Sequence, residues 1–147
     1  MICFLQGDFM RTYYIFNINR EMSILTKDSP YMLFKSLESI YKANRNDLFI
    51  ATNLYEQLAT KFNKEIVNNR ISCDFRENQF YMYNHNNHSY YNKYRDETCN
   101  IEVKNSYLIC KCKNTRFELF KRLKDFSLFA CDFENKDYFW LDEVLSM

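Results

Sequence analysis

Two histidines are the residues whose type and spacing come nearest to a metal-binding pair. His85 and His88 are separated by two residues, and imidazole is a good zinc ligand. No cysteine or carboxylate stands beside them at zinc-site spacing, and they fall in a polar, tyrosine-rich segment, residues 84–95, that is typical of a loop. We therefore expect two solvated histidines, no bound metal and no other cofactor.

Three cysteines form the second group that could do chemistry. Cys110 and Cys112 should lie on one face of a strand because side chains alternate along it, and Cys99 should lie near the facing strand. The paired two-residue spacing of zinc ribbons is absent. The apolar residues 1–5 lack the basic stretch and the cleavage site of a signal peptide, so we expect a reducing compartment in which the six cysteines stay free thiols. We interpret them as small buried packing residues.

Four carboxylates gather around the last predicted hairpin, at Asp132, Glu134, Asp137 and Asp142. General acid–base catalysis needs a carboxyl group whose pKa is raised by burial, and nothing in the pattern indicates one. No serine or cysteine has a histidine in a recognisable local motif. We expect solvated turn residues and no enzymatic activity.

The scarcity of glycine excludes several function classes. Gly7 is the only glycine of the chain, and Pro30 is the only proline. Phosphate-binding loops, the Rossmann turn and the strand-to-helix elbow of serine hydrolases all need glycine, which lets the backbone approach a ligand or adopt a strained turn. We therefore expect no bound nucleotide and no small-molecule ligand.

The length and charge of the chain indicate one ordinary domain. It has 147 residues and a formal net charge of +1, which gives no general attraction to nucleic acid or to anionic membranes. No apolar run approaches the roughly 20 residues that span a bilayer. We expect a soluble cytoplasmic protein, with residues 1–9 as an N-terminal extension and residues 10–147 as a single domain.

The first half of the chain predicts one strand and two helices. Aromatic and β-branched residues at 13–18 indicate a strand, followed by a loop at 19–28. The serine–proline pair at 29–30 is typical of a helix start, and apolar spacing extends this helix to about residue 43. A second apolar stripe predicts a helix over 47–67.

The second half predicts hairpins around a third helix. The expected elements are strands at 71–75 and 80–83, strands at 99–103 and 107–112, a helix at 115–125, and strands at 128–133 and 137–141. The order is β-α-α-β-β-β-β-α-β-β. The fold class is therefore α+β, with a mostly antiparallel sheet of hairpins packed against about three helices.

Two further features bear on the partner. The third predicted helix is basic, with Lys113, Arg116, Lys121, Arg122 and Lys124, which favours a solvated outer face over a phosphate-binding one. Aromatic residues make up 18% of the chain. Tyrosine and phenylalanine are frequent both in cores and in interface hot spots, so the aromatic content fits a large core or a recognition surface.

Three segments resemble the SirA proteins, the sporulation inhibitors of replication. They are residues 13–16 (YYIF), 32–37 (MLFKSL) and 126–141 (FSLFACDFENKDYFWL), within a region of similarity over about 10–142. The last segment has the family's apolar strand, its Asn-Xaa-Lys-type turn and its aromatic strand with Trp-Leu. The resemblance implies a protein that binds the N-terminal domain of the initiator DnaA and blocks replication initiation.

The resemblance also implies where the partner binds. In the family the contact face involves the segment after the first strand and the neighbouring helices. The corresponding positions here are Met22, Leu25, Thr26, Leu54 and Tyr55. The alternatives are a nucleic-acid-binding module, or a protein-interaction module with another partner.

Overall fold

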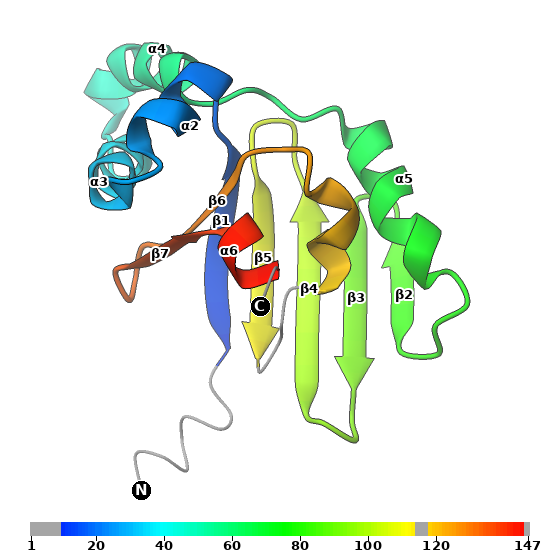
Figure 1. Ribbon diagram of the computed structural model, residues 1–147. Coiled ribbons are helices and arrows are strands. Elements are labelled where there is room, and N and C mark those ends of the chain that lie inside the picture. The colour runs from blue at the N-terminus through cyan, green and yellow to red at the C-terminus, as the bar shows by residue number, and fades with distance from the viewer. Residues whose placement is uncertain (1–9, 114–117, 146–147) are drawn as a thin grey trace, which may run out of the picture.

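The computed structural model describes residues 10–113 and 118–145. In this part of the chain seven strands form one sheet in the order β2-β3-β4-β5-β1-β6-β7, and every neighbouring pair is antiparallel (Figure 1). The strands are β1 (Arg11–Asn17), β2 (Tyr81–Asn84), β3 (Asn87–Asn92), β4 (Glu97–Val103), β5 (Leu108–Lys113), β6 (Leu128–Asp132) and β7 (Asp137–Trp140). The predicted α+β class is confirmed.

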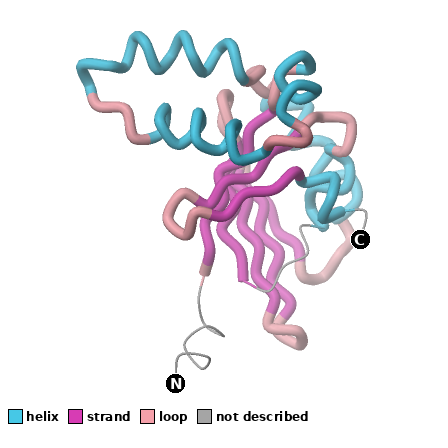
Figure 2. The backbone as a smooth tube through the Cα atoms, turned by 60° about the vertical axis from the view of Figure 1, so that its left-hand side comes forward, coloured by secondary structure: helices cyan, strands magenta, loops and turns pink. Residues whose placement is uncertain are grey.

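Helices cover the two faces of the sheet unequally. The α-helices are α2 (Arg20–Thr26), α3 (Pro30–Tyr41), α4 (Leu48–Leu58), α5 (Lys64–Phe75) and α6 (Leu141–Leu145), and the 3-10 helices are η1 (Arg45–Asp47) and η2 (Glu118–Leu123). On one face α5, η2 and α6 pack over the sheet. On the other face α2, α3 and α4, which we call the helical cap, gather at one end and project away from it (Figures 1 and 2).

Alternate residues of β1 enter two separate cores. Tyr13 and Ile15 belong to the first core, with α5, η2 and α6, whereas Phe16 belongs to the second core, under the helical cap. This division follows from the two-residue side-chain period of a strand. The predicted inward residues Leu33, Phe34 and Leu37 of α3 are buried in the second core, as expected; for Leu33 the exposed fraction is 1%.

Aromatic stacking fixes the helical cap on the β6–β7 hairpin. The ring centroid of Phe34 lies 4.8 Å from that of Tyr138, and the ring of Tyr41 stacks on Phe133 at 4.5 Å. Phe129 and Trp140 meet edge to face at 4.9 Å. Such pairs contribute about 1 kcal/mol each beyond the apolar area that they bury. The last hairpin therefore determines where α3 lies.

A buried carboxylate joins α3 to the turn of the same hairpin. Glu38 accepts hydrogen bonds from Lys136 and from Lys35, the latter at 3.1 Å, and lies 3.5 Å from the ammonium group of Lys42. The hydrogen bonds from Lys136 and Lys35 lower the pKa of Glu38 to about 2. The glutamate therefore stays ionised and holds three lysines around it.

Two predictions in the first half are wrong because tertiary contacts decide the local structure. The expected loop at 19–28 contains α2, whose start is held by Asn19: its amide donates to the carbonyl of Gln57 at 2.9 Å, and its Oδ1 accepts from Thr60. The expected helix at 47–67 is two helices. Ala59 is extended, and Asn63 begins α5 by accepting from the amide of Ile66 at 3.1 Å.

The first predicted hairpin is displaced along the chain. Residues 71–75 are the end of α5, and the hairpin pairs β2 with β3, so most of the expected loop at 84–95 is strand. Among the described residues the left-handed backbone positions are His85, Asp96 and Lys136, with φ of 54°, 53° and 58°. Asparagine, aspartate and histidine are the non-glycine residues most enriched in this region.

The end of the chain combines correct and incorrect predictions. The hairpins β4–β5 and β6–β7 are confirmed. The third helix is shorter and 3-10 in form, and its expected start at Thr115, like Arg116, lies outside the described residues. Leu141, expected to end a strand, begins α6.

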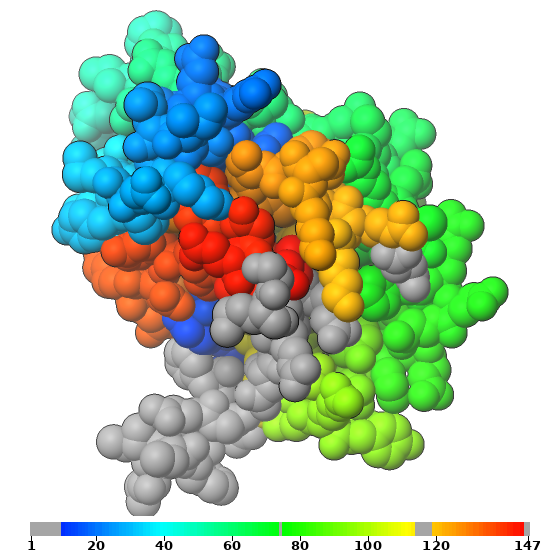
Figure 3. All heavy atoms as spheres, in the orientation of Figure 1, coloured from blue at the N-terminus to red at the C-terminus, as the bar shows by residue number. Residues whose placement is uncertain are grey.

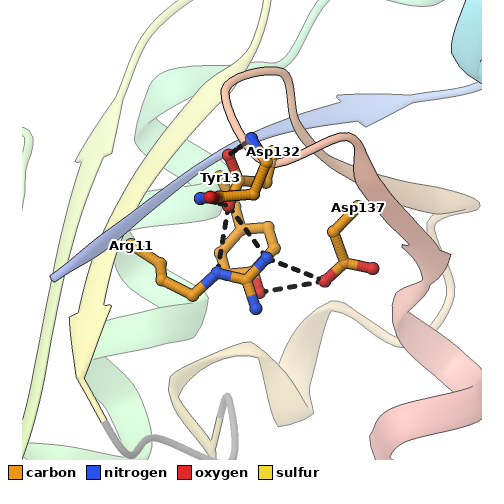
Figure 4. Close-up of polar contacts among 5 residues, drawn as sticks. Arg11, Tyr13, Asp132 and Asp137 are labelled. Atoms are coloured by element: carbon orange, nitrogen blue, oxygen red, sulfur yellow. Dashed lines mark hydrogen bonds and ion pairs between the residues drawn. The ribbon is translucent and has the colours of Figure 1, made fainter. Parts of the chain in front are cut away.

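One carboxylate of the last hairpin is buried, against expectation. Asp132 is 1% exposed and accepts from Nε of Arg11 at 3.0 Å and from the backbone and side-chain amides of Asn135 at 3.1 and 2.8 Å. The same guanidinium reaches Asp137 at 3.0 Å, where the hydroxyl of Tyr13 also donates (Figure 4). Every described bond to Asp132 orders the turn or joins it to β1, so its role is structural.

Replacing this carboxylate should destabilise the fold. We expect Asp132→Ala to lower the free energy of unfolding by roughly 3 kcal/mol, because it removes the buried one of the arginine's two carboxylate partners and the acceptor that orders the turn. Glu134→Ala, an exposed residue of the same turn, should change it by less than about 0.5 kcal/mol. Urea denaturation measures both, and equal effects would refute the structural role.

Candidate functional site

Exposed apolar side chains concentrate on the helical cap. Of the fourteen large apolar side chains that are exposed in the described parts of the chain, eight lie between residues 24 and 50. They are Ile24, Leu25, Tyr31, Met32, Tyr41, Leu48, Phe49 and Ile50. Single exposed apolar residues are normal, but a concentration of them over one structural unit marks an interaction surface.

Four of these residues form a patch on neighbouring helices. Ile24 and Leu25 on α2 are 69% and 73% exposed, and Tyr31 and Met32 at the start of α3 are 55% and 65% exposed. Because α2 and α3 are in contact and their surfaces adjoin at the upper left of Figure 3, these side chains can contact one partner together. We call them the α2–α3 patch.

A second exposed group begins α4. Leu48, Phe49 and Ile50 are consecutive and are 55%, 78% and 67% exposed. The preceding turn is well ordered, since Asn44 accepts from the amides of Asn46 and Asp47 at 3.0 and 3.2 Å. Three consecutive exposed apolar residues at an ordered helix start disfavour solubility unless a partner covers them.

Between the cap and the sheet lies a cavity of about 420 Å³, which we call the tyrosine groove. Its described lining residues are Tyr14, Phe16, Leu37, Ile40, Tyr41, Leu48, Ala51, Thr52, Tyr55, Ser106 and Tyr107. None of these is acidic, basic, a histidine or a cysteine, so they offer no acid–base pair for catalysis. The groove is suited to receive an apolar side chain.

The tyrosine hydroxyls of the groove are held by local hydrogen bonds. Tyr55 donates to the carbonyl of Ser106, and the hydroxyls of Tyr14 and Tyr41 lie 3.4 Å apart. The bond with Tyr41, together with burial, raises the pKa of Tyr14 to about 12, and burial raises that of Tyr55 further. These phenols are therefore neutral near pH 7 and act as hydrogen-bonding groups only.

The structure separates the five residues that the sequence suggested for partner binding. Leu25 is exposed in the α2–α3 patch, whereas Met22, Leu54 and Tyr55 are half-buried against the second core. Thr26 is buried, and its hydroxyl donates to the carbonyl of Met22 at 2.6 Å. Leu25 is thus the best placed of the five to contact a partner, and Tyr55 contributes to the groove.

Several candidate residues were missed at the level of sequence. The run Leu48–Ile50 carried a usable signal, because a helix can turn only part of three consecutive residues toward its core. Tyr31 and Met32 carried the same signal more weakly. Tyr14 and Tyr107 carried none, since β1 and the β4–β5 turn meet the cap only through the tertiary fold.

The interpretation of the histidines is wrong for His88. It is fully buried on β3, with Nδ1 2.6 Å from the hydroxyl of Tyr81 and Nε2 2.8 Å from Oδ1 of Asn68. Because Asn68 donates its amide to Asn86 at 2.8 Å, its oxygen faces the ring, so Nε2 carries the proton and Nδ1 accepts from Tyr81. His85 is exposed in the β2–β3 turn.

The interpretation of the cysteines as buried residues is confirmed for Cys99, Cys110, Cys112 and Cys131. It is wrong for Cys73, which is exposed near the end of α5, and Cys3 lies outside the described residues. Cys99, Cys110 and Cys112 are at most 5% exposed in the first core, with the sulfur atoms of Cys99 and Cys110 3.6 Å apart. Hydrogen bonds with Cys112 and Cys99, and burial, raise the pKa of Cys110 well above its usual value, so it stays a thiol. Over residues 10–113 and 118–145, no three metal-ligating side chains are placed to hold an ion.

Comparisons with known proteins found no relative that would assign a function. No protein-family model matches the chain, and no curated protein matches it. Among the described helices, none combines the length and apolar character that crossing a bilayer requires.

The buried His88 should make stability depend on pH. Burial lowers its pKa from 6.5 to about 4, so the unfolded chain binds a proton more readily than the folded one. The contribution of neutral His88 to the free energy of unfolding is complete above pH 6.5 and is lost as the pH falls towards 4. We expect the free energy of unfolding to fall by about 2 kcal/mol between pH 7 and pH 5.

Urea denaturation at the two pH values measures this dependence. His88→Gln should abolish most of the pH dependence of stability, whatever the effect of the substitution on stability at pH 7. His85→Asn, which alters the exposed histidine and suits its left-handed backbone, should retain it. If the stability of His88→Gln depended on pH as strongly as that of the unchanged protein, His88 would not be the group responsible.

Proposed function

We propose that this protein inhibits DNA replication initiation by binding the N-terminal domain of the initiator DnaA through its helical cap. The observation that carries the proposal is the concentration of exposed apolar side chains on α2, α3 and the start of α4. The cap is held rigidly from below by the β6–β7 hairpin, so its outer surface is presented to a partner in a fixed form.

The chemistry of the cap suits a protein partner. Its exposed residues are aliphatic and aromatic, and such side chains supply most of the binding energy at protein interfaces. A typical specific complex buries about 800 Å² on each partner. The α2–α3 patch and the start of α4 together can form the apolar centre of an interface of that size.

The identity of the partner is supported by the resemblance to the SirA proteins. Its longest segment, residues 126–141, forms β6 and β7, and this hairpin carries the stacking residues Phe129, Phe133 and Trp140 of the second core. The residues that resemble the SirA proteins are therefore the ones that position the helical cap. The proposal places the protein in the cytoplasm, where the initiator works, and has it act stoichiometrically by occupying a surface of DnaA.

Calorimetric titration of the full chain with the purified DnaA N-terminal domain tests the partner. We expect a 1:1 complex that persists at both 0.1 and 0.5 M salt, because apolar contacts supply most of its binding energy. No heat and no complex at tens of micromolar would remove DnaA as the partner. A steep loss of affinity with salt would favour a charge-driven complex instead.

Charged substitutions on the cap should weaken the complex without unfolding the protein. We expect Leu25→Arg and Phe49→Arg each to reduce affinity at least tenfold, about 1.4 kcal/mol, because they place a charge in an apolar contact. Both side chains are largely exposed, so the melting temperature should stay within about 2 °C.

Tyr94→Arg is the matched control. Tyr94 lies in the β3–β4 turn away from the cap and is 78% exposed, as Phe49 is. The Tyr94→Arg variant should bind DnaA with the same affinity as the unchanged protein. Full affinity in both cap variants, or an equal loss in the control, would show that the partner does not bind through the cap.

A further inference from the structure

The tyrosine groove opens into a second depression. A cavity of about 540 Å³ shares Tyr14 and Tyr41 with the groove and is also lined by Thr12, Lys42, Lys111 and Glu134. Figure 2 shows α3 and α4 projecting together from one face of the sheet, and the two cavities lie where these helices meet β1. The depression therefore has an apolar part beneath the helices and a polar part over the strands.

The apolar part has a rigid floor. Phe16 and Leu37 are 6% and 1% exposed and belong to the second core, whereas Tyr41 at the rim is 52% exposed. The volume of about 420 Å³ lies within the range of preformed binding pockets, and it can hold one or two large apolar side chains. A partner side chain inserted here would be removed from water on most sides.

The exposed charged residues that line the second cavity are Lys42, Lys111 and Glu134. Lys111 has no ion-pair partner among the described residues, and Lys42 shares Glu38 with Lys35 and Lys136. Glu38 is only 5% exposed, and Asp132 at the base of the second cavity is bound by Arg11. Among the described lining residues, two exposed ammonium groups therefore stand against the one exposed carboxylate of Glu134. The exposed charge beside the groove is positive on balance, although the whole chain carries a net charge of only +1.

The tyrosines of the rim add hydrogen-bond donors. Only one hydroxyl of the Tyr14–Tyr41 pair can donate to the other, so the accepting hydroxyl keeps a proton for another acceptor. A carboxylate can accept from this proton and from a neighbouring lysine at the same time. The rim thus favours an anionic group next to an apolar one.

We propose that the tyrosine groove, with Lys42 and Lys111 at its edge, binds an acidic protein segment that carries large apolar side chains. The proposal rests on the proposed function, since it names a segment of the protein partner as the occupant. The apolar part receives the partner's hydrophobic side chains, and its carboxylates lie on the lysines. A nucleic acid would leave the apolar part without an occupant, and is therefore disfavoured.

Fluorescence anisotropy with two synthetic peptides tests the chemistry. The first is a labelled twelve-residue peptide with leucine and phenylalanine at helical spacing and glutamate elsewhere, and the second has lysine in place of every glutamate. We expect the full chain to bind the acidic peptide at least tenfold more tightly than the basic one. Equal binding of both peptides, or no binding at 1 mM protein, would overturn the proposal.

Charge reversal locates the acidic contact. Lys42→Glu combined with Lys111→Glu should reverse the preference, so that the basic peptide binds more tightly. Lys61→Glu combined with Lys93→Glu changes the net charge equally at exposed positions that line neither cavity, and should keep the preference for the acidic peptide. An equal effect of the two double variants would contradict binding in the groove.

Filling the groove locates the apolar contact. Thr52 is exposed and lines the groove, whereas the adjacent Asn53 is exposed and does not line it. Thr52→Trp should reduce binding of the acidic peptide at least tenfold at an unchanged melting temperature, and Asn53→Trp should not. Equal peptide binding by Thr52→Trp and Asn53→Trp would show that the apolar contact lies elsewhere.

The same pair separates this proposal from the proposed function. If DnaA binds the unchanged protein, and binds Thr52→Trp and Asn53→Trp equally, DnaA is the partner but does not bind in the groove. If the acidic peptide binds as expected and DnaA does not bind, the groove is a binding site and the partner is another acidic protein.

Discussion

Strand β1 is hydrogen-bonded on both edges, to β5 and to β6, and each of its faces enters a different core. Tyr13 and Ile15 join the core beneath α5 and η2, and Phe16 joins the core beneath the helical cap. The helices of the two faces therefore do not have to pack against each other. The position of the cap relative to the sheet depends on this strand and on the β6–β7 hairpin beside it.

The unequal cover of the two faces explains why binding surfaces arise on one side. On the face of the first core, α5, η2 and α6 lie over the strands. The side chains of His88, Cys99, Cys110, Cys112 and Asp132 are used there in packing or in structural hydrogen bonds. On the other face the cap covers only β1, β6 and β7. The cap's edge over β1 forms the groove, and its outer surface remains apolar and exposed.

Buried polar groups connect distant segments where glycine-based turns are absent. Asp132 joins the β6–β7 turn to β1, Glu38 joins that turn to α3, and Asn19 joins the start of α2 to the end of α4. Left-handed turn positions are taken by a histidine, an aspartate and a lysine. These contacts occupy the inner titratable groups with structural hydrogen bonds and ion pairs.

The sequence by itself determined the elements whose signals are local. The helix after Ser29, the hairpins β4–β5 and β6–β7, the buried face of Leu33, Phe34 and Leu37, and the buried cysteines all follow from side-chain periodicity and from turn or cap residues. The family resemblance also led to the prediction that Leu25 contacts a partner.

Only the tertiary structure decided the elements that depend on distant partners. Helix α2 forms because Asn19 is held by α4, and the continuous apolar stripe at 47–67 is divided because Ala59 pairs with Ile18. His88 is buried because Asn68 and Tyr81 satisfy both ring nitrogens. The groove exists because Tyr14, Tyr55 and Tyr107, remote in sequence, meet at one edge of the cap. Periodicity within a short window carries no information about such contacts, since their energy comes from residues outside the window.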